Sequence, residues 1–288
     1  MALSANQAEA ERQAAADLAM KLKFEAAFAR DLRVFFRGIR RDFATLYIAA
    51  GTNITTRDYQ PDLVAILRKN YRKIARAFGG QLVAQINKAF EVELTKQEEE
   101  EDGMSAAAIV ALGAAAAEIT RRRINDRANK QSGFILRTTQ SEYDGALAAA
   151  VGKALSEGTL QNRPATAKEV TTSLTPRQNS RADVIATTET NGVAERAKQT
   201  EANVVAASAV VIGGVAVRNN MVKVWNAVLD EVTRIPHASA DGQVRRLDEP
   251  FLVNRESLMH PGDTSLGASA GNVINCRCSS QFMFKGAL

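Results

Sequence analysis

The sequence predicts a mainly α-helical protein in which a long helical N-terminal region is followed by a smaller, loop-rich α+β domain. Two observations predict this fold class. Apolar residues recur every three or four positions through the first 155 residues, which is the period of an amphipathic helix. After residue 208, β-branched residues bracketed by glycines replace this period. We therefore expect a helical region at 1–155 and an α+β domain at 156–288.

Composition narrows the class of protein. The chain has 288 residues, of which 45% are hydrophobic, and this apolar fraction excludes a disordered protein. The 37 basic and 32 acidic residues leave a net charge of +5, too small by itself to indicate nucleic-acid binding. No apolar run approaches 18 residues, so we expect no membrane span. Two cysteines exclude a disulfide scaffold and favour a reducing compartment.

A long amphipathic helix is predicted to open the chain and to end at Gly51. Its apolar face carries Phe28, Leu32 and Phe35, and arginines at the same rhythm fall on a different face. A second arginine row follows in the next predicted helix. The candidate contact residues of the two rows are Arg30, Arg33, Arg37, Arg40, Arg68, Arg72 and Arg76. Two interpretations stay open: solvated helix faces, or sequence-independent contact with DNA or an acidic partner.

The remaining helices are predicted from their start and stop signals. Pro61 opens the second helix, which Gly79 and Gly80 are expected to kink or split. The acidic run at 98–102 predicts a solvated helix end and turn, and an alanine-rich third helix follows.

Residues 157–181 are expected to form connections. Thr166 and Glu169 have the spacing of a capping box, which predicts the start of a short helix. A helical pattern then continues to about Ala207. We expect two short strands next, near 210–217 and 222–225, and a tail of loops after them.

All four His and Cys side chains of the protein lie in its last 52 residues, at His237, His260, Cys276 and Cys278. Thiolate and imidazole are ligands that zinc prefers, although Cys-x-Cys is a weaker zinc signal than Cys-x-x-Cys. Three interpretations stay open. The residues bind a metal, or the cysteines pack as small hydrophobic residues in a knot of loops, or they form a strained disulfide, which a reducing compartment disfavours.

An ordered series of short motifs fills the C-terminal third. It starts with the threonine-glutamate segment at 186–191 around Glu189 and continues with Trp225, Asp230 to Arg234, and His237. It ends with Asp241-Gly242, the segments 248–251 and 261–263, and Asn275-Cys276-Arg277-Cys278. In this order the motifs resemble the phage Mu F-like minor head proteins, also called phage head morphogenesis proteins. The resemblance covers about residues 181–280.

The resemblance implies a structural virion protein of a tailed bacteriophage. Such a protein associates with the portal vertex, is needed for head morphogenesis, and is assembled in the host bacterial cytoplasm. The implied partners are the portal protein, other head or connector proteins and further copies of the chain. Two alternatives within this class are a head-to-tail connector or adaptor ring bound to the portal, and a DNA-binding protein ejected with the genome. A DNA-binding or DNA-modifying protein of the host bacterium is the rival class.

The same resemblance selects site residues. It does not call for a histidine at His260, so His237, Cys276 and Cys278 are the better metal ligands, with structural zinc as the candidate cofactor. The other motif residues are expected to be structural: Glu189, Trp225, Asp230, Asp241, Gly242, Asn275 and Arg277. Arg277 is expected to pair with Asp230, Asp241 or Glu189. Together the His, Asp and Cys side chains are expected to hold the tail against the Glu189 helix.

We predict that the protein is not an enzyme. A Cys nucleophile with His237 as its base is conceivable, but Cys-x-Cys has no recognised nucleophile surroundings here. The sequence also lacks a Walker loop, a His-Glu-x-x-His motif, a Gly-x-Ser-x-Gly motif and a Rossmann fingerprint.

Overall fold

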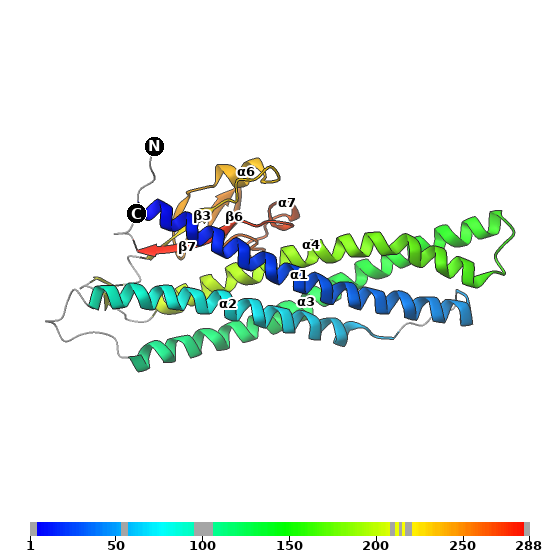
Figure 1. Cartoon of the computed structure of the whole chain (residues 1–288), viewed down its shortest axis with the longest axis horizontal. Helices are drawn as coiled ribbons and strands as arrows, with labels where there is room; N and C mark the ends of the chain where they lie inside the picture. Colours follow the sequence, from blue (N-terminus) through cyan, green and yellow to red (C-terminus); the bar gives the residue numbers. More distant parts are fainter. Residues whose placement is uncertain are drawn as a thin grey trace. The chain divides into compact units, whose positions relative to one another are not determined.

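The protein is described from a computed structural model that covers residues 5–52, 57–94, 106–207, 211–212, 215–216 and 221–284. Four long helices come first, and short antiparallel strands with loops follow in the C-terminal part (Figure 1). With 72% of the described residues in helices, the structure has the predicted fold class.

The helices begin and end close to the predicted signals. They are α1 (Ala5–Ala50), α2 (Gln60–Leu94), α3 (Ala106–Ser156) and α4 (Arg163–Ala207). Gly51 follows α1 with a φ of +67° and donates its N–H to the carbonyl of Tyr47, which is a helix C-cap that favours glycine. Pro61 is the second residue of α2, as predicted. The predicted turn at 98–102 lies outside the described residues.

The glycine pair in α2 does not split the helix, which runs through both residues. Gly79 lies against α4, where a Cβ atom would sit 3.1 Å from the Oε1 atom of Glu201. A small residue is therefore needed at Gly79 for the close approach of the two helices. The predicted kink stays a prediction.

The expected connections at 157–181 are wrong for all but the first few residues. The turn ends at Asn162, whose Oδ1 accepts the N–H of Ala165, so Asn162 caps α4. Thr166 lies inside the helix and donates to the carbonyl of Asn162, so the predicted capping box is not used. The helix also continues through Pro176. Tertiary packing of its buried face overrides these local signals.

The C-terminal part contains more strands than the two predicted. Strand β3 (Met221–Asn226) is the centre of a three-stranded antiparallel sheet of order β4-β3-β7, with β4 at Val244–Arg246 and β7 at Ser279–Phe284. In this sheet Val222 lies opposite Arg246 on one side and Met283 on the other. The additional strands are short, and several do not alternate apolar and polar residues, so their sequences carry a weak signal.

Two small hairpins and two short helices complete this part. The hairpins pair β1 (Val211–Ile212) with β2 (Val215–Ala216), and β5 (Phe251–Val253) with β6 (Glu256–Leu258). The helices are α6 (Ile235–Ser239) and α7 (Ala270–Val273).

Contacts between Cα atoms divide the chain into two compact units. Unit 1 comprises residues 1–24, 71–124 and 187–288, and unit 2 comprises residues 25–70 and 125–186. Each unit therefore combines distant segments of the chain. The predicted boundary at residue 155 falls at the end of α3 and remains a prediction about the domains.

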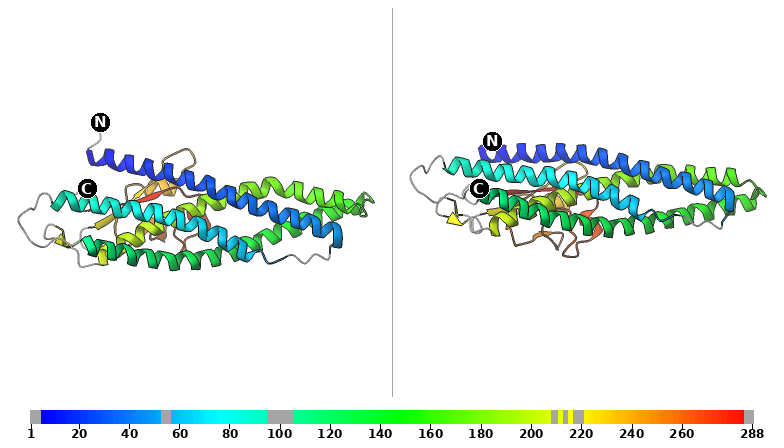
Figure 2. Two further views of the ribbon diagram at one scale, coloured as in Figure 1. Left: turned by 60° about the horizontal axis from the view of Figure 1, so that its bottom comes forward. Right: turned by 90° about the horizontal axis from the view of Figure 1, so that it is seen from below.

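Unit 2 is helical and has an apolar interior. Phe36, Leu63 and Leu67 are fully buried in it, and the ring of Phe43 lies 5.1 Å from that of Tyr143. Its α3 and α4 segments are joined by the turn at 157–162, which both views of Figure 2 show as the end of a helical hairpin. Ion pairs such as Lys69–Asp31 lie at its surface.

Unit 1 contains the strands and two apolar clusters. One cluster packs the ends of α2 and α4 against β3, with Leu82, Ala202 and Met221 among its members. The other surrounds Trp225 and Phe251, whose rings meet edge to face with centroids 5.3 Å apart. Both cysteines belong to this second cluster, so the predicted site lies inside a core.

Candidate functional site

Three segments of unit 1 bring His237, Cys276 and Cys278 together. His237 lies on α6, Cys276 follows α7, and Cys278 directly precedes β7. Asn275 has a φ of +56°, a left-handed conformation that Asn tolerates better than most residues, and its N–H donates to the hydroxyl of Thr188 on α4. The chain therefore turns against α4 immediately before the two cysteines.

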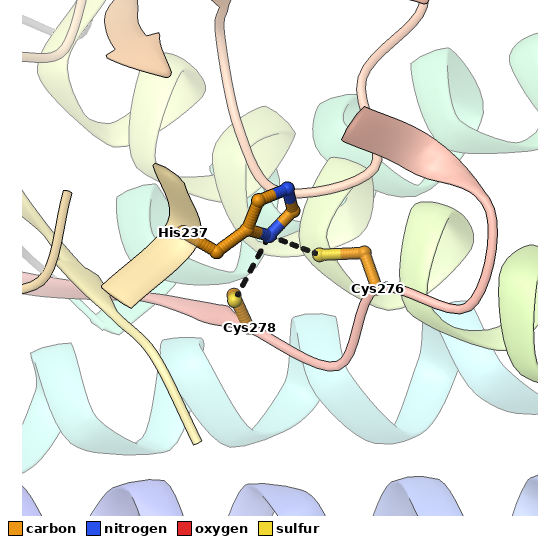
Figure 3. A group of neighbouring side chains, drawn as sticks. All are labelled: His237, Cys276 and Cys278. Atoms are coloured by element: carbon orange, nitrogen blue, oxygen red, sulfur yellow. Dashed lines mark hydrogen bonds between the residues drawn. The ribbon is translucent and has the colours of Figure 1, made fainter. Parts of the chain in front are cut away.

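The three side chains converge on a single point, as Figure 3 shows. The Nδ1 atom of His237 lies 3.6 Å from the sulfur of Cys276 and 3.5 Å from that of Cys278. The three candidate ligand atoms all lie within 4.8 Å of one another, and all three residues are buried. Both cysteines are free thiols, so a disulfide does not hold them.

The two thiols differ in acidity because they share a hydrogen bond. Cys278 donates to Cys276, and this bond, together with the contact to His237, holds the pKa of Cys276 well below its usual range although burial opposes the shift. The same bond and burial raise the pKa of Cys278. The arrangement therefore favours one thiolate beside one thiol.

The donor set and its spacing fit a tetrahedral zinc ion. Bonds of about 2.3 Å to sulfur and about 2.0–2.1 Å to nitrogen, set at the tetrahedral angle, separate a sulfur from a nitrogen ligand by about 3.5 Å. The two observed sulfur–nitrogen distances agree with this value. A cavity of about 30 Å³ adjoins the triad, with Asp230 and Thr233 in its lining, and has room for a water molecule as the fourth ligand.

The second ring nitrogen of His237 is aimed away from the sulfurs. Its Nε2 atom is buried and has no hydrogen-bond partner among the described residues. The ring meets Trp225 edge to face at 5.7 Å, so apolar packing fixes its orientation. Coordination through Nδ1 therefore requires no rotation of the imidazole.

The predicted turn at Asp241-Gly242 is confirmed and connects α6 to the end of β3. Gly242 has a φ of +72° and donates its N–H to the carbonyl of Trp225 at 2.8 Å. The carboxylate of Asp241 accepts the N–H of Ala227, also at 2.8 Å. These bonds fix the end of β3 to the residues after α6.

The Pro261-Gly262-Asp263 segment is also a turn, and it packs on α4. Gly262 has a φ of +74°, and a Cβ atom there would sit 3.2 Å from the Cα of Gly192. Asp263 is buried and accepts hydrogen bonds from the N–H of Met259 and from Arg196 of α4. Burial raises the pKa of Asp263, but the neighbouring His260 and the hydrogen bonds from Ser265 and Met259 outweigh burial and lower that pKa.

His260 does not join the triad. It is buried, and its Nδ1 faces the carbonyl of Pro261 at 3.0 Å, while its Nε2 lies 3.8 Å from Asp263. Burial lowers the pKa of His260 to about 4, so the ring is neutral at physiological pH. The structure therefore separates the two histidines and brings only His237 to the cysteines.

The motif that links these turns belongs to a known family. Residues 145–281 match the family model described as Phage Mu protein F like protein. Residues 145–281 are phage Mu F-like. The predicted resemblance is thereby confirmed, and the family is one of head morphogenesis proteins, a structural rather than a catalytic class. No curated protein and no solved structure matches the chain significantly.

The Mu F-like region also uses the threonine-glutamate segment of α4 as predicted. Thr188 accepts the N–H of Asn275, and the buried carboxylate of Glu189 accepts the phenolic hydroxyl of Tyr71 on α2. Arg277 lines the cavity beside the triad together with Asp230, whose carboxylate accepts the hydroxyl of Thr233. The ion pair predicted for Arg277 stays a prediction.

Sequence reasoning missed a buried group of four charges that ties α1 to the Mu F-like region. Glu195 of α4 lies 2.8 Å from both Lys21 and Lys198, and Lys198 lies 2.8 Å from Asp17. All four side chains are at least nine-tenths buried. We call these four residues the charge quartet.

The charge quartet contacts Cys278 and the start of β7 directly. Lys21 donates to the carbonyl of Cys278 at 3.1 Å and to the side chain of Asn191 at 2.6 Å. Glu195 accepts the N–H of Ser280, and Lys198 donates to the carbonyl of the same residue. In Figure 1 the N-terminal part of α1 accordingly lies beside β7.

A signal for the charge quartet exists in the sequence. Asp17 and Lys21 are four residues apart and continue the helical spacing of Phe28 and Leu32, so they fall on the apolar face of α1. Charged residues at such positions indicate buried ion pairs when a partner is present. The partners on α4 are more than 170 residues away, which is why the pattern alone did not reveal them.

The predicted arginine contact residues fall into two groups. Arg33 pairs with Asp183, Arg40 is buried and donates to Gln178, and Arg68 donates to Asn129, so these three bind within unit 2. The others are exposed, and contact with DNA or the portal stays a prediction for them. They are Arg30, Arg37, Arg72 and Arg76. None of the described helices is long and apolar enough to cross a bilayer.

Proposed function

We propose that this chain is a minor structural protein of a tailed-phage head, bound at the portal vertex and needed for head morphogenesis. The observation that carries this proposal is the family match over residues 145–281. The structure supports it, because residues of the matched motif form a buried, hydrogen-bonded knot of loops. Its partners in this function are the portal protein, other head or connector proteins and further copies of the chain.

Two arrangements satisfy this function. A connector or adaptor ring bound to the portal has a fixed number of copies with rotational symmetry. A DNA-binding protein ejected with the genome has copies inside the head that leave the particle during infection. The exposed arginines of α1 and α2 support contact with DNA, and the long helices offer surfaces for ring contacts.

Analysis of the particles themselves tests the proposal. Purified virions and DNA-free heads are examined by quantitative mass spectrometry, and the chain is expected in both at low copy number relative to the major head protein. Deletion of its gene is expected to abolish infectious heads, and expression from a plasmid is expected to restore them. Absence of the polypeptide from both kinds of particle would overturn the proposal. Symmetry in the intact particle distinguishes a ring from internal copies.

In the same function, His237, Cys276 and Cys278 hold a structural zinc ion that fixes the knot. The sulfur–nitrogen distances and the buried donor set support this part of the proposal. Bound metal stabilises a loop-rich segment because the unfolded chain offers no preformed site.

Metal analysis of the purified protein tests this site. We expect about one zinc ion per chain by elemental analysis. Removing the metal with a chelator, or the His237→Ala substitution, is expected to lower the free energy of unfolding by about 3 kcal/mol or more. His260→Ala is the matched control, since it removes a buried imidazole outside the triad and is expected to keep the metal. Metal-free wild-type protein whose melting temperature is unchanged by added zinc would refute the site.

A further inference from the structure

The segment 229–235, which we call the apolar loop, joins β3 to α6 and exposes three large aliphatic side chains. Leu229 is 60% exposed, Val232 76% and Ile235 82%. Ile274 is also exposed and lies beside the loop, because Arg234 donates to its carbonyl at 2.6 Å. Exposed aliphatic side chains grouped in this way are typical of contact surfaces.

The apolar loop is held in one shape. The hydroxyl of Thr233 accepts the N–H of Asp230 at 3.1 Å and donates to its carboxylate at 2.6 Å. Leu229 has a φ of +57°, a left-handed conformation that costs a non-glycine residue about 1–2 kcal/mol. Because the side chain of Leu229 is mostly exposed, its packing within the chain offsets little of this strain energy. A preformed loop of this kind loses little conformational entropy when it binds another surface.

The charges of the loop indicate what kind of surface fits it. Asp230 and Glu231 of the loop are exposed, whereas its one basic residue, Arg234, is half-buried and bonded to Ile274, so the exposed charges of the loop are acidic. A complementary surface is basic and carries an exposed aliphatic residue. One face of α1 has these properties: Arg30, Val34, Arg37 and Arg41 follow one another at steps of four, three and four, and all four are exposed. We call this face the α1 stripe, and its Val34 is 59% exposed.

The distribution of charge over the chain favours the same pairing. Unit 2, which contains the α1 stripe, has 16 basic and 11 acidic residues. Unit 1, which contains the apolar loop, has 21 of each. The entire net charge of +5 therefore belongs to unit 2, and an acidic surface on one copy is attracted to unit 2 of another.

We propose that the apolar loop of one copy binds the α1 stripe of a second copy. The two surfaces differ, so the contact is head-to-tail, and each copy keeps a free loop or a free stripe that can bind a further copy. The contact area is small compared with that of permanent oligomers, so we expect association in the micromolar range. The proposal deepens the copy-to-copy contacts of the proposed function but is tested on the isolated protein, so either can fail without the other.

Sedimentation velocity of the purified full chain tests the contact. Between about 5 and 200 μM at low salt, the wild type is expected to form dimers and larger species, and about 0.5 M salt is expected to dissociate them. Val232→Ser/Ile235→Ser removes the apolar loop surface and Arg37→Glu damages the α1 stripe. Each variant is expected to weaken association at least tenfold. An equimolar mixture of the two is expected to form dimers and nothing larger, because one intact loop then meets one intact stripe.

Two controls separate this contact from general surface effects. Leu252→Ser removes an aliphatic side chain of β5 that is 55% exposed, and Arg177→Glu reverses an exposed charge on α4. Both are expected to associate like the wild type, and all variants are expected to keep the wild-type circular dichroism spectrum. A wild type that stays monomeric at every concentration, or a mixture that fails to form dimers, would overturn the proposal.

Discussion

The two units differ in where their ion pairs lie, although the same four long helices contribute to both. Unit 2 has an excess of basic residues, and ion pairs such as Arg33–Asp183 lie at its surface. Unit 1 has balanced charges, and it buries the charge quartet completely or almost completely. Exposed pairs contribute little to stability, whereas a buried charge that loses its partner is costly.

This difference shows which contacts determine the fold of the Mu F-like region. Apolar stripes determine most of unit 2, with few buried polar contacts such as Arg40–Gln178, so many sequences with the same period would pack in a similar way. In unit 1 the charge quartet, the hydrogen bonds of Asp263 and the triad each require particular partners. The fold of the motif therefore depends on α1 and α2 as well as on the matched residues.

Removing the central carboxylate of the charge quartet is expected to have the largest effect on stability. Glu195→Ala leaves Lys21 and Lys198 buried without that partner, and we expect a loss of about 3–5 kcal/mol in the free energy of unfolding. Asp183→Ala in unit 2 breaks an exposed pair and is expected to cost about 0.5 kcal/mol. Urea unfolding of both variants measures the contrast. Equal losses would show that the two units do not differ in this respect.

The buried carboxylate also predicts behaviour in acid. Two lysines hold the pKa of Glu195 at about 2 although burial opposes the shift, whereas the unfolded side chain titrates near its usual 4.5. The carboxylate therefore adds stability that is fully present above about pH 4.5 and is lost as the pH falls toward 2. In Glu195→Ala this part of the acid dependence should disappear.

Two glycines with positive φ, one in each unit, allow a comparison of how closely the two units are packed around a turn. Gly158 of unit 2 and Gly262 of unit 1 both have positive φ, but a Cβ atom at Gly158 meets nothing within 4 Å. We expect Gly158→Ala to cost about 1 kcal/mol through backbone strain alone. Gly262→Ala adds a clash with the backbone of Gly192 and is expected to cost about 3 kcal/mol. Thermal unfolding distinguishes the two, and the reverse order would contradict the close packing of the 261–263 turn on α4.

A modest effect of opposite sign, an increase in stability, is expected at Glu201. Burial raises the pKa of this carboxyl to about 7, so the folded chain binds a proton more tightly than the unfolded chain. Stability is thus greatest below pH 4.5 and falls as the pH rises to 7. Glu201→Gln should therefore stabilise the protein by about 1–2 kcal/mol at pH 8 and leave it unchanged at pH 4. A variant that is less stable at pH 8 would show that the carboxylate has a compensating partner.

The sequence predicted those parts of the structure that depend on local chemistry. Gly51, Pro61 and Asp241-Gly242 act where they were expected, because capping, a fixed φ and a left-handed turn need no distant partner. The approach of His237 to the two cysteines was also predicted. It rested on the types of side chain and on the resemblance of the ordered motif, rather than on any predicted topology.

The parts that were missed depend on distant partners. Pro176 reads as a helix breaker, yet the buried face of α4 continues on both sides of it, with Leu174 and Ala182 in the core. The sequence of β7 has no clear alternation of apolar and polar residues, so the sequence alone does not predict a strand there. The strand forms because it pairs with β3. Tyr71 becomes a partner of Glu189 only when α2 and α4 pack together.

The hydrogen bond from Lys21 to the carbonyl of Cys278 spans 257 positions of the chain. During synthesis Lys21 leaves the ribosome long before Cys278 has been added to the chain. Pairing over such a sequence separation is slow because the intervening loop must first be closed. The nascent chain must therefore carry an amphipathic helix with unmatched charges on its apolar side until translation is nearly complete. Chaperones that shield such helices are expected to determine the yield of correctly closed molecules.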